Sequence, residues 1–112
     1  MKPDDRVRFT HIVDALNNAI SFTAGRSRQD LDTDAMLTLA LMQAIQIVGE
    51  AANNVSPETQ DRHPQIPWRL IIGMRHRLVH AYTDVDHDIL WTTATAAAPA
   101  LLAQVKSILE GG

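Results

Sequence analysis

The chain has 112 residues, 46% of them apolar and 21% charged, which is typical of one small soluble globular domain spanning residues 1–112. It contains no cysteine, and this excludes disulfide bonds and thiolate metal sites. The formal net charge of −3 excludes a uniformly basic nucleic-acid-binding domain, so any nucleic-acid site must be a local basic patch.

Apolar residues at helical spacing predict two long helices in the first half of the chain. The first covers residues 4–24, begins at an aspartate and ends before Gly25. The second runs from about residue 33 to 54 and has Asp32 or Thr33 as its N-cap. Apolar residues nearly encircle the second helix, which predicts a central place in the domain or burial in an oligomer.

The second half of the chain predicts three further helices, separated by connections rich in proline and aspartate. These helices begin after Ser56, at Pro67 and after Asp84 or Asp86, and the last two cover about 67–81 and 87–110. Pro99 predicts a break or bend in the last of them. No strand pattern is visible, so we expect an all-α bundle of about five helices with short connections.

The longest apolar stretch, AMLTLALMQAIQIVGEAA, lies in the second predicted helix. Polar residues such as Gln43, Gln46 and Glu50 interrupt it, which makes it too polar for a membrane span. The start of the chain, MKPDDRVRFT, lacks the apolar core of a signal peptide. We therefore expect a cytoplasmic protein that does not associate with membranes.

The segment MRHRLVHAY, residues 74–82, concentrates cationic and titratable groups in a stretch that otherwise has the pattern of a buried helix. Together with a preceding arginine, it forms a basic patch of Arg69, Arg75, His76, Arg77 and His80 that contains no acidic residue. A run of this kind is more often a solvated helix face. On an ideal helix, Arg75 lies nearly in line with Tyr82, whereas His80 diverges from Arg75 by about 140°. The long side chain of arginine can cover part of this gap. A distorted helix end, or a second copy of the chain across a two-fold axis, can cover more of it.

The residue types of this segment suit one kind of chemistry. The planar, permanent charge of arginine matches phosphate oxygens, and histidine transfers protons near neutral pH. No carboxylate lies inside the segment to hold Mg²⁺. Arginine and histidine without a metal are what an RNase needs when the 2′-hydroxyl of the substrate is the nucleophile, because histidine moves the proton and arginine stabilises the transition state.

The segment contains the pattern Arg-x4-His-x-Tyr, carried by Arg75, His80 and Tyr82. The blocks IVGEAANNVS at 47–56 and IPWRLIIGM at 66–74 accompany it, and with them nearly the whole chain resembles the HepT-like ribonuclease toxin branch of the HEPN superfamily. The resemblance implies a small helical bundle that forms a homodimer, with two Arg/His motifs facing one cleft. It implies a metal-independent endoribonuclease that uses no cofactor, cleaves RNA and has Arg75 and His80 as catalytic residues.

The resemblance also implies a place in a type VII-like toxin–antitoxin system. The expected partner is a minimal nucleotidyltransferase antitoxin, which neutralises the toxin by adenylylating the motif tyrosine, here Tyr82. One residue departs from the family pattern, because His76 stands where a polar residue, often asparagine, commonly follows the motif arginine. His76 can add a second proton carrier or change how Arg75 is held, and we treat it, with Arg77 and Glu50, as a supporting residue.

Other interpretations of these residues stay open. Glu50, on an otherwise apolar helix, is expected either to orient an arginine of the motif, from its own or a second subunit, or to face solvent. His76, His80 and His87 with the nearby aspartates have the composition of a metal site, but helix caps and turns explain those aspartates better. The alternative function is a catalytically inactive dimeric helical module that binds a partner protein or a nucleotide.

Four residues outside the motif receive structural interpretations. Trp68 and Trp91 are expected to anchor the core or an interface, since a large aromatic side chain contributes most when it is buried. Arg26 and Arg28 lie in a polar connection, where a solvated loop is the simplest prediction and contact with RNA or a partner is the alternative.

Overall fold

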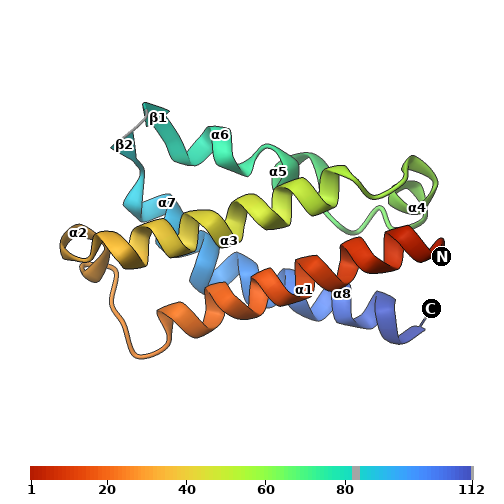
Figure 1. Ribbon diagram of the computed structural model, residues 1–112, viewed down its shortest axis with the longest axis horizontal. Coiled ribbons are helices and arrows are strands. Elements are labelled where there is room, and N and C mark those ends of the chain that lie inside the picture. The colour runs from red at the N-terminus through yellow and green to blue at the C-terminus, as the bar shows by residue number, and fades with distance from the viewer. Residues whose placement is uncertain (82–83, 112) are drawn as a thin grey trace.

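Two long helices, α1 (Pro3–Thr23) and α3 (Ala35–Asn53), run side by side through the computed structural model (Figure 1). On one side of α3 lie α1 and α8 (Ala98–Gly111), and on the other lie α5 (Trp68–Ile72) and α6 (Met74–Leu78). The central place that the apolar surface of α3 predicted is therefore confirmed.

The structure describes residues 1–81 and 84–111, and of residues 80 and 81 it describes the backbone. The shorter elements are α2 (Asp30–Thr33), α4 (Pro57–Arg62), β1 (Val79–Ala81), β2 (Asp84–Val85), α7 (His87–Thr92) and the π-helical turn η1 (Thr93–Ala97). The five predicted helical segments correspond to α1, α3, α4, the α5–α6 pair and the continuous α7–η1–α8 helix. The all-α class is confirmed, and the short antiparallel ladder of β1 and β2 is an addition that the sequence did not predict.

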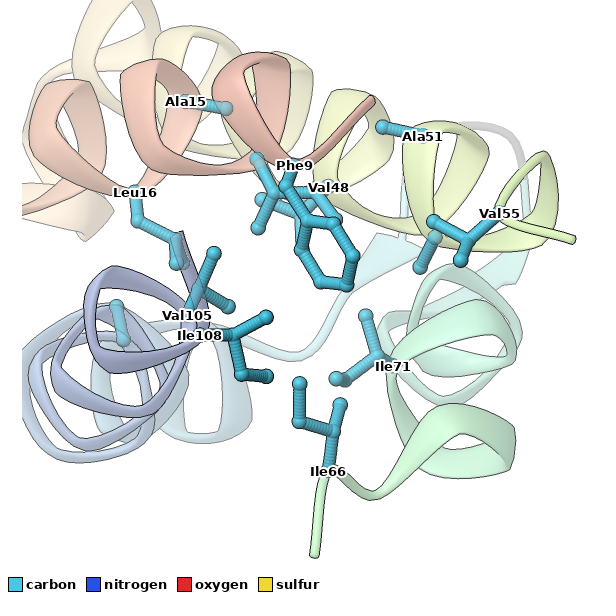
Figure 2. Close-up of a cluster of buried hydrophobic side chains, with 13 residues drawn as sticks. Phe9, Ala15, Leu16, Val48, Ala51, Val55, Ile66, Ile71, Val105 and Ile108 are labelled. Carbon is cyan, nitrogen blue, oxygen red and sulfur yellow. The ribbon is translucent and has the colours of Figure 1, made fainter. Parts of the chain in front are cut away.

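Two clusters of buried apolar side chains fill the bundle. The first joins α1, α3, α5 and α8 around the fully buried Phe9, and it includes Val105 of α8 (Figure 2). The second joins α2, α3, α6 and α7 through Leu41, Leu78 and Leu90, all of them fully buried. Because α3 contributes to both clusters, it fixes the position of α5 and α6 relative to the rest of the bundle.

Both tryptophans pack against these clusters. Trp68 lies against the first, with its ring centroid 6.0 Å from that of Phe9, and its Nε1 donates a hydrogen bond to the carbonyl oxygen of His63 at 3.0 Å. Trp91 packs against the second cluster. The edge-on contact of Trp68 with Phe9 is one of the favoured aromatic arrangements. The prediction that the two tryptophans anchor the core is confirmed.

Local capping chemistry explains the starts of α4 and α7, and the cap of α3 differs from the predicted one. Ser56 and Asp86 cap α4 and α7 as predicted, accepting hydrogen bonds from the backbone N–H groups three residues later. The cap of α3 is Asp34, whose Oδ1 accepts from the N–H of Leu37 at 3.1 Å, so the prediction of Asp32 or Thr33 is wrong. Those two residues belong to α2, a single helical turn inside the predicted connection.

Asp5 does not cap α1, although an aspartate was expected to do so. Its carboxylate is buried, with 3% of the residue exposed, and it accepts hydrogen bonds from the backbone and side chain of Ser56 and from the hydroxyl of Thr59 at 2.6–2.8 Å. Burial raises the pKa of Asp5, but the hydrogen bonds from Ser56 and Thr59 outweigh burial and hold the pKa below its ordinary value. Asp5 thus joins the start of α1 to the start of α4.

Replacing Asp5 should destabilise the fold measurably. Asp5→Asn should lower the free energy of unfolding at neutral pH by about 2 kcal/mol, because an amide cannot accept hydrogen bonds from all three donors. The stabilisation by Asp5 is fully present above the unfolded-state pKa of about 3.9 and is lost as the pH falls through the lower pKa of the folded state. Urea denaturation at neutral and acidic pH measures both effects. The exposed neighbour Asp4 provides the control variant, Asp4→Asn, and an equal loss in the two variants would contradict the assignment.

The C-terminal helix changes its winding where the sequence predicted a break. The π-helical turn η1 comes directly before α8, and Pro99 is the second residue of α8. Proline has no N–H, and its ring clashes with the carbonyl group four residues earlier, so regular α-helical winding is unfavourable at this point. The chain therefore adapts to the proline with a wider turn and stays helical from His87 to Gly111.

By length and composition alone, α3 could cross a membrane, contrary to the expectation that its polar residues exclude this. Core helices of soluble proteins pass the same test. In this structure α3 buries side chains of both core clusters, among them Leu41 and Val48. Its apolar composition is therefore explained by its central position in the bundle.

Candidate active site

The predicted helix over 67–81 is two short helices followed by a strand. The first, α5, ends at Ile72, and the N–H of the following Gly73 donates to the carbonyl oxygen of Arg69 at 3.0 Å. The second, α6, ends at Leu78, and the following residue, Val79, is extended. Glycine is a poor helix former and β-branched valine favours extended backbone, so both ends agree with the local sequence. The continuous helix on which the expected alignment of Arg75 with Tyr82 depends ends at Leu78, and Tyr82 itself lies outside the described residues.

His80 lies at an irregularity of the small ladder. Val79 of β1 faces Val85 of β2, and Ala81 faces the adjacent Asp84, so His80 is the extra residue of a β-bulge. The N–H of Asp86 donates to the carbonyl oxygen of Leu78 at 2.8 Å and closes the ladder at the end of α6. Bulges change the direction of a strand and occur frequently beside active sites. A distorted helix end, one of the ways considered for bringing arginine and histidine closer, is therefore present in the backbone.

The structure places the predicted site residues of the 74–82 segment that it describes on two consecutive elements, while Glu50 lies on α3. Arg75, His76 and Arg77 are exposed on α6, and the backbone of His80 belongs to β1. Tyr82 lies outside the described residues. In Figure 1, α6 and β1 follow one another along the edge of the bundle, on the side of α3 opposite to α1.

The arginines of the connection between α1 and α3 form ion pairs with aspartates, whereas Arg75 and Arg77 of α6 form none with the described residues. Arg26 pairs with Asp30 and Asp34 at 3.2 and 2.6 Å, and hydrogen bonds to Asp34 and Asp30 raise the pKa of Arg26. Among the described residues, no carboxylate lies within salt-bridge distance of Arg75 or Arg77. Their positive charge is therefore available to an anionic ligand.

Arg28 links the same connection to the start of α7. It pairs with Asp32 at 2.8 Å and with Asp88 at 2.5 Å, and these hydrogen bonds raise its pKa. The Nδ1 of His87 lies 2.8 Å from Asp32, and hydrogen bonds from His87 and Arg28 lower the pKa of Asp32. The predicted solvated loop is thus an ion-paired segment that holds α7 in place just after the ladder.

The aspartates that suggested a metal site have other roles in the described structure. Asp86 caps α7, Asp88 pairs with Arg28, and His87 pairs with Asp32. Among the side chains that the structure describes, which do not include that of His80, no group of three or more acidic or histidine side chains is arranged to hold a metal ion.

A groove runs between α3 and the α5–α6 pair, with a volume of about 190 Å³. It is lined by Ile45, Gln46, Gly49, Glu50, Asn53, Ile71, Ile72, Arg75 and His76. Gly49 lets the helices approach closely, because a Cβ atom at this position would lie 3.2 Å from the carbonyl oxygen of Ile71. The groove therefore brings two candidate site residues of α6, Arg75 and His76, together with Glu50 of α3.

Glu50 is exposed at this groove, and its Oε1 accepts a hydrogen bond from Nε2 of Gln46 at 3.1 Å. Among the described residues of the single chain, no arginine pairs with Glu50. Pairing with an arginine of a second subunit stays a prediction.

Most of the chain also matches known proteins. The family described as Ribonuclease HepT-like matches residues 12–108. The chain belongs to the HepT-like ribonuclease family. A putative RNase of Caldanaerobacter subterraneus subsp. tengcongensis is 37% identical over 100 residues, which is 89% of each chain. A probable ribonuclease HepT of Thermococcus cleftensis is 32% identical over 108 residues, and a putative RNase of Methanocaldococcus jannaschii is 25% identical over 107, each covering 96% of this chain and 98% of the relative. No solved structure gives a significant match.

The sequence did not single out every residue of the site in this HepT-like chain. Gln46, Gly49 and Asn53 line the groove beside Arg75 but were not predicted to do so. A signal was present, because 46, 49, 50 and 53 are spaced by three and four residues and share one face of α3. That face became recognisable as a groove wall only when α5 and α6 were placed against it.

Proposed function

We propose that this HepT-like protein is an endoribonuclease toxin that cleaves RNA without a metal ion. The observation that supports this most is the exposed guanidinium of Arg75, which has no acidic partner among the described residues and lies close in sequence to the bulge that carries His80. Relatives named as ribonucleases match nearly the whole chain, which supports a ribonuclease activity.

In this mechanism the 2′-hydroxyl of the RNA attacks the adjacent phosphorus atom. His80 acts as general acid and base, moving the proton from the attacking hydroxyl and delivering a proton to the 5′-oxygen as the P–O5′ bond breaks. Arg75 stabilises the additional negative charge on the phosphate oxygens in the transition state. Arg77 supports the site by adding positive charge next to Arg75, and His76 supports it as a second proton carrier or by changing how Arg75 is held. The products are a 2′,3′-cyclic phosphate and a free 5′-hydroxyl.

The proposal includes a homodimer in which two copies of the motif face one cleft. Several large apolar residues are exposed in the single chain. The exposed fraction is 81% for Met36, 68% for Leu39 and 44% for Leu70. Met36 and Leu39 lie on α3, and in a two-fold contact the same patch of each copy meets its counterpart. The polar residues Gln46 and Glu50 continue the exposed stripe of α3 towards Arg75, so a partner seated on this stripe would lie near the groove.

The proposed dimer can be tested by the mass of the protein in solution. Wild-type protein should have the mass of a dimer in light scattering at micromolar concentration, and the double variant Met36→Lys, Leu39→Lys should have the mass of a monomer, because two charges cannot be buried there without partners. The control is Val7→Lys on α1, at the other end of the bundle, where the side chain is also exposed. A monomeric wild type would contradict the proposal.

The expected partner is a minimal nucleotidyltransferase antitoxin that acts on Tyr82. In that reaction the phenol oxygen of Tyr82 forms a bond to the α-phosphorus of ATP, the phenol loses its proton and pyrophosphate leaves. The added group carries a phosphodiester charge, which Arg75 and Arg77, close to Tyr82 in sequence, can bind by charge-assisted hydrogen bonds.

A growth experiment separates the proposed toxin from a binding module without activity. Expression of the wild-type chain without the antitoxin should arrest growth and produce RNA fragments, whereas a catalytically inactive module should do neither. Co-expression of the antitoxin should restore growth. Normal growth, together with purified protein that leaves RNA intact, would favour the binding module.

A further inference from the structure

The groove beside Arg75 has walls of different chemical character. Gln46, Glu50 and Asn53 of α3 bring amide and carboxylate groups to one side, and Arg75 of α6 brings positive charge to the other. At the bottom, Ile45 is largely buried. An apolar surface with a few polar groups around it is the usual composition of a site for a small flat ligand.

The hydrogen bond between Gln46 and Glu50 determines which groups this wall can offer. An ionised carboxylate only accepts hydrogen bonds, so the amide nitrogen of Gln46 must face Glu50, as the Nε2–Oε1 distance of 3.1 Å shows. The amide oxygen of Gln46 and the second carboxylate oxygen of Glu50 have no protein donor among the described side chains. The wall therefore offers two acceptors to a ligand.

A carboxylate so close to the proposed phosphate site needs a specific reason. Glu50 repels the negatively charged RNA backbone, and this costs affinity unless the carboxylate meets hydrogen-bond donors of the RNA. The donors that RNA has besides its hydroxyl groups are the amino and imino groups of its bases. Adenine, cytosine and guanine each have an exocyclic amino group, and carboxylate and amide side chains recognise such groups in nucleic acids. Uracil has two carbonyl oxygens flanking its single N–H, and these oxygens would face the two acceptors.

We propose that Gln46 and Glu50 form a nucleobase subsite that selects an amino-bearing base next to the scissile phosphate and disfavours uracil. The inference rests on the proposed ribonuclease function, since the phosphate bound by Arg75 sets the position of the base. Glu50 accepts hydrogen bonds from the base edge, Gln46 orients Glu50 and supplies the second acceptor, and Ile45 provides an apolar surface for the base.

The subsite is tested by mapping cleavage positions in RNA of random sequence. Wild-type protein should cleave about tenfold less often where uracil occupies one particular position beside the cut. A tenfold ratio corresponds to the discrimination that one good side chain–base contact provides. Glu50→Gln and Gln46→Ala should each raise relative cleavage at uracil towards that of the other bases. The control is Gln43→Ala, an exposed glutamine on the same helix that does not line the groove, and it should keep the wild-type preference.

A binding measurement separates this inference from the proposed ribonuclease function. Fluorescence anisotropy gives the affinity for uncleavable 2′-O-methyl oligonucleotides that contain A, C, G or U. Weaker binding of the U oligonucleotide, equalised by Glu50→Gln, supports the subsite even if the protein cleaves no RNA. Cleavage and binding without base preference, or with a preference that survives both variants, would overturn the subsite and leave the ribonuclease proposal intact.

Discussion

Alanine at Arg75 or at His80 should abolish growth arrest and lower the rate of RNA cleavage about 10²–10⁴-fold. Arg75→Ala removes the charge that stabilises the transition state, and His80→Ala removes the group that moves the proton. The folded structure should persist in Arg75→Ala, because the side chain is exposed and pairs with no carboxylate among the described residues. Single-turnover cleavage of a labelled RNA measures the rate, and circular dichroism verifies the helical content.

Two controls make this result specific to the motif. Arg8→Ala removes a partly buried arginine from α1, on the side of α3 opposite to α6, and should keep full activity. Leu78→Ala removes a fully buried side chain of the second core cluster. It should lower the free energy of unfolding by about 2–5 kcal/mol, and the activity should fall with it.

Cleavage of RNA by the wild-type protein should continue in EDTA. Activity that EDTA removes and a divalent metal restores would refute the mechanism and revive the metal interpretation.

The periodic parts of the fold could be predicted from the sequence. Helices α1 and α3 are 21 and 19 residues long, so their apolar residues repeat often enough to establish the helical period. Local capping chemistry placed Ser56 and Asp86 correctly, because a cap depends on residues only three positions away. Such signals need no knowledge of the tertiary structure.

The end of α6 could not be predicted in the same way. Strands β1 and β2 have three and two residues, which is too short for an alternating pattern to be recognised. The apolar residues Leu78 and Val79 also fit the helical pattern of the preceding turn, so the sequence favoured a continuous helix through His80. The start of α7 is held by contacts that span 55 and 60 residues, His87 with Asp32 and Arg28 with Asp88, and local sequence carries no signal for such contacts.

The sequence named candidate site residues but could not predict their geometry. The pattern of Arg75, His80 and Tyr82 identified the segment, but the interpretation of its positions assumed a helix. The groove wall of Gln46 and Glu50 came only from the packing of α3 against α5 and α6, made possible by the close approach at Gly49. Motifs specify which groups take part, whereas contacts between distant segments decide where these groups lie.

Phenylalanine at position 82 should free the toxin from its antitoxin. Tyr82→Phe lacks the oxygen that attacks ATP, so co-expression with an active nucleotidyltransferase should no longer restore growth, provided that the variant itself cleaves RNA. The wild-type chain should gain one or more AMP units under the same conditions, located on Tyr82 by peptide fragmentation and intact mass. A tyrosine that serves only for packing would tolerate the change without any effect on neutralisation.

The physical reason for neutralisation is competition for the same cation. The phosphodiester on Tyr82 adds a negative charge close in sequence to Arg75 and Arg77, and charge-assisted hydrogen bonds to arginine are among the stronger ones in proteins. The modified side chain then occupies the position of the RNA phosphate, while the adenosine blocks access to the groove. A partner variant that binds the toxin but cannot transfer AMP is the control, and it should fail to restore growth. If that variant silences the toxin while Tyr82 stays unmodified, neutralisation works by binding alone.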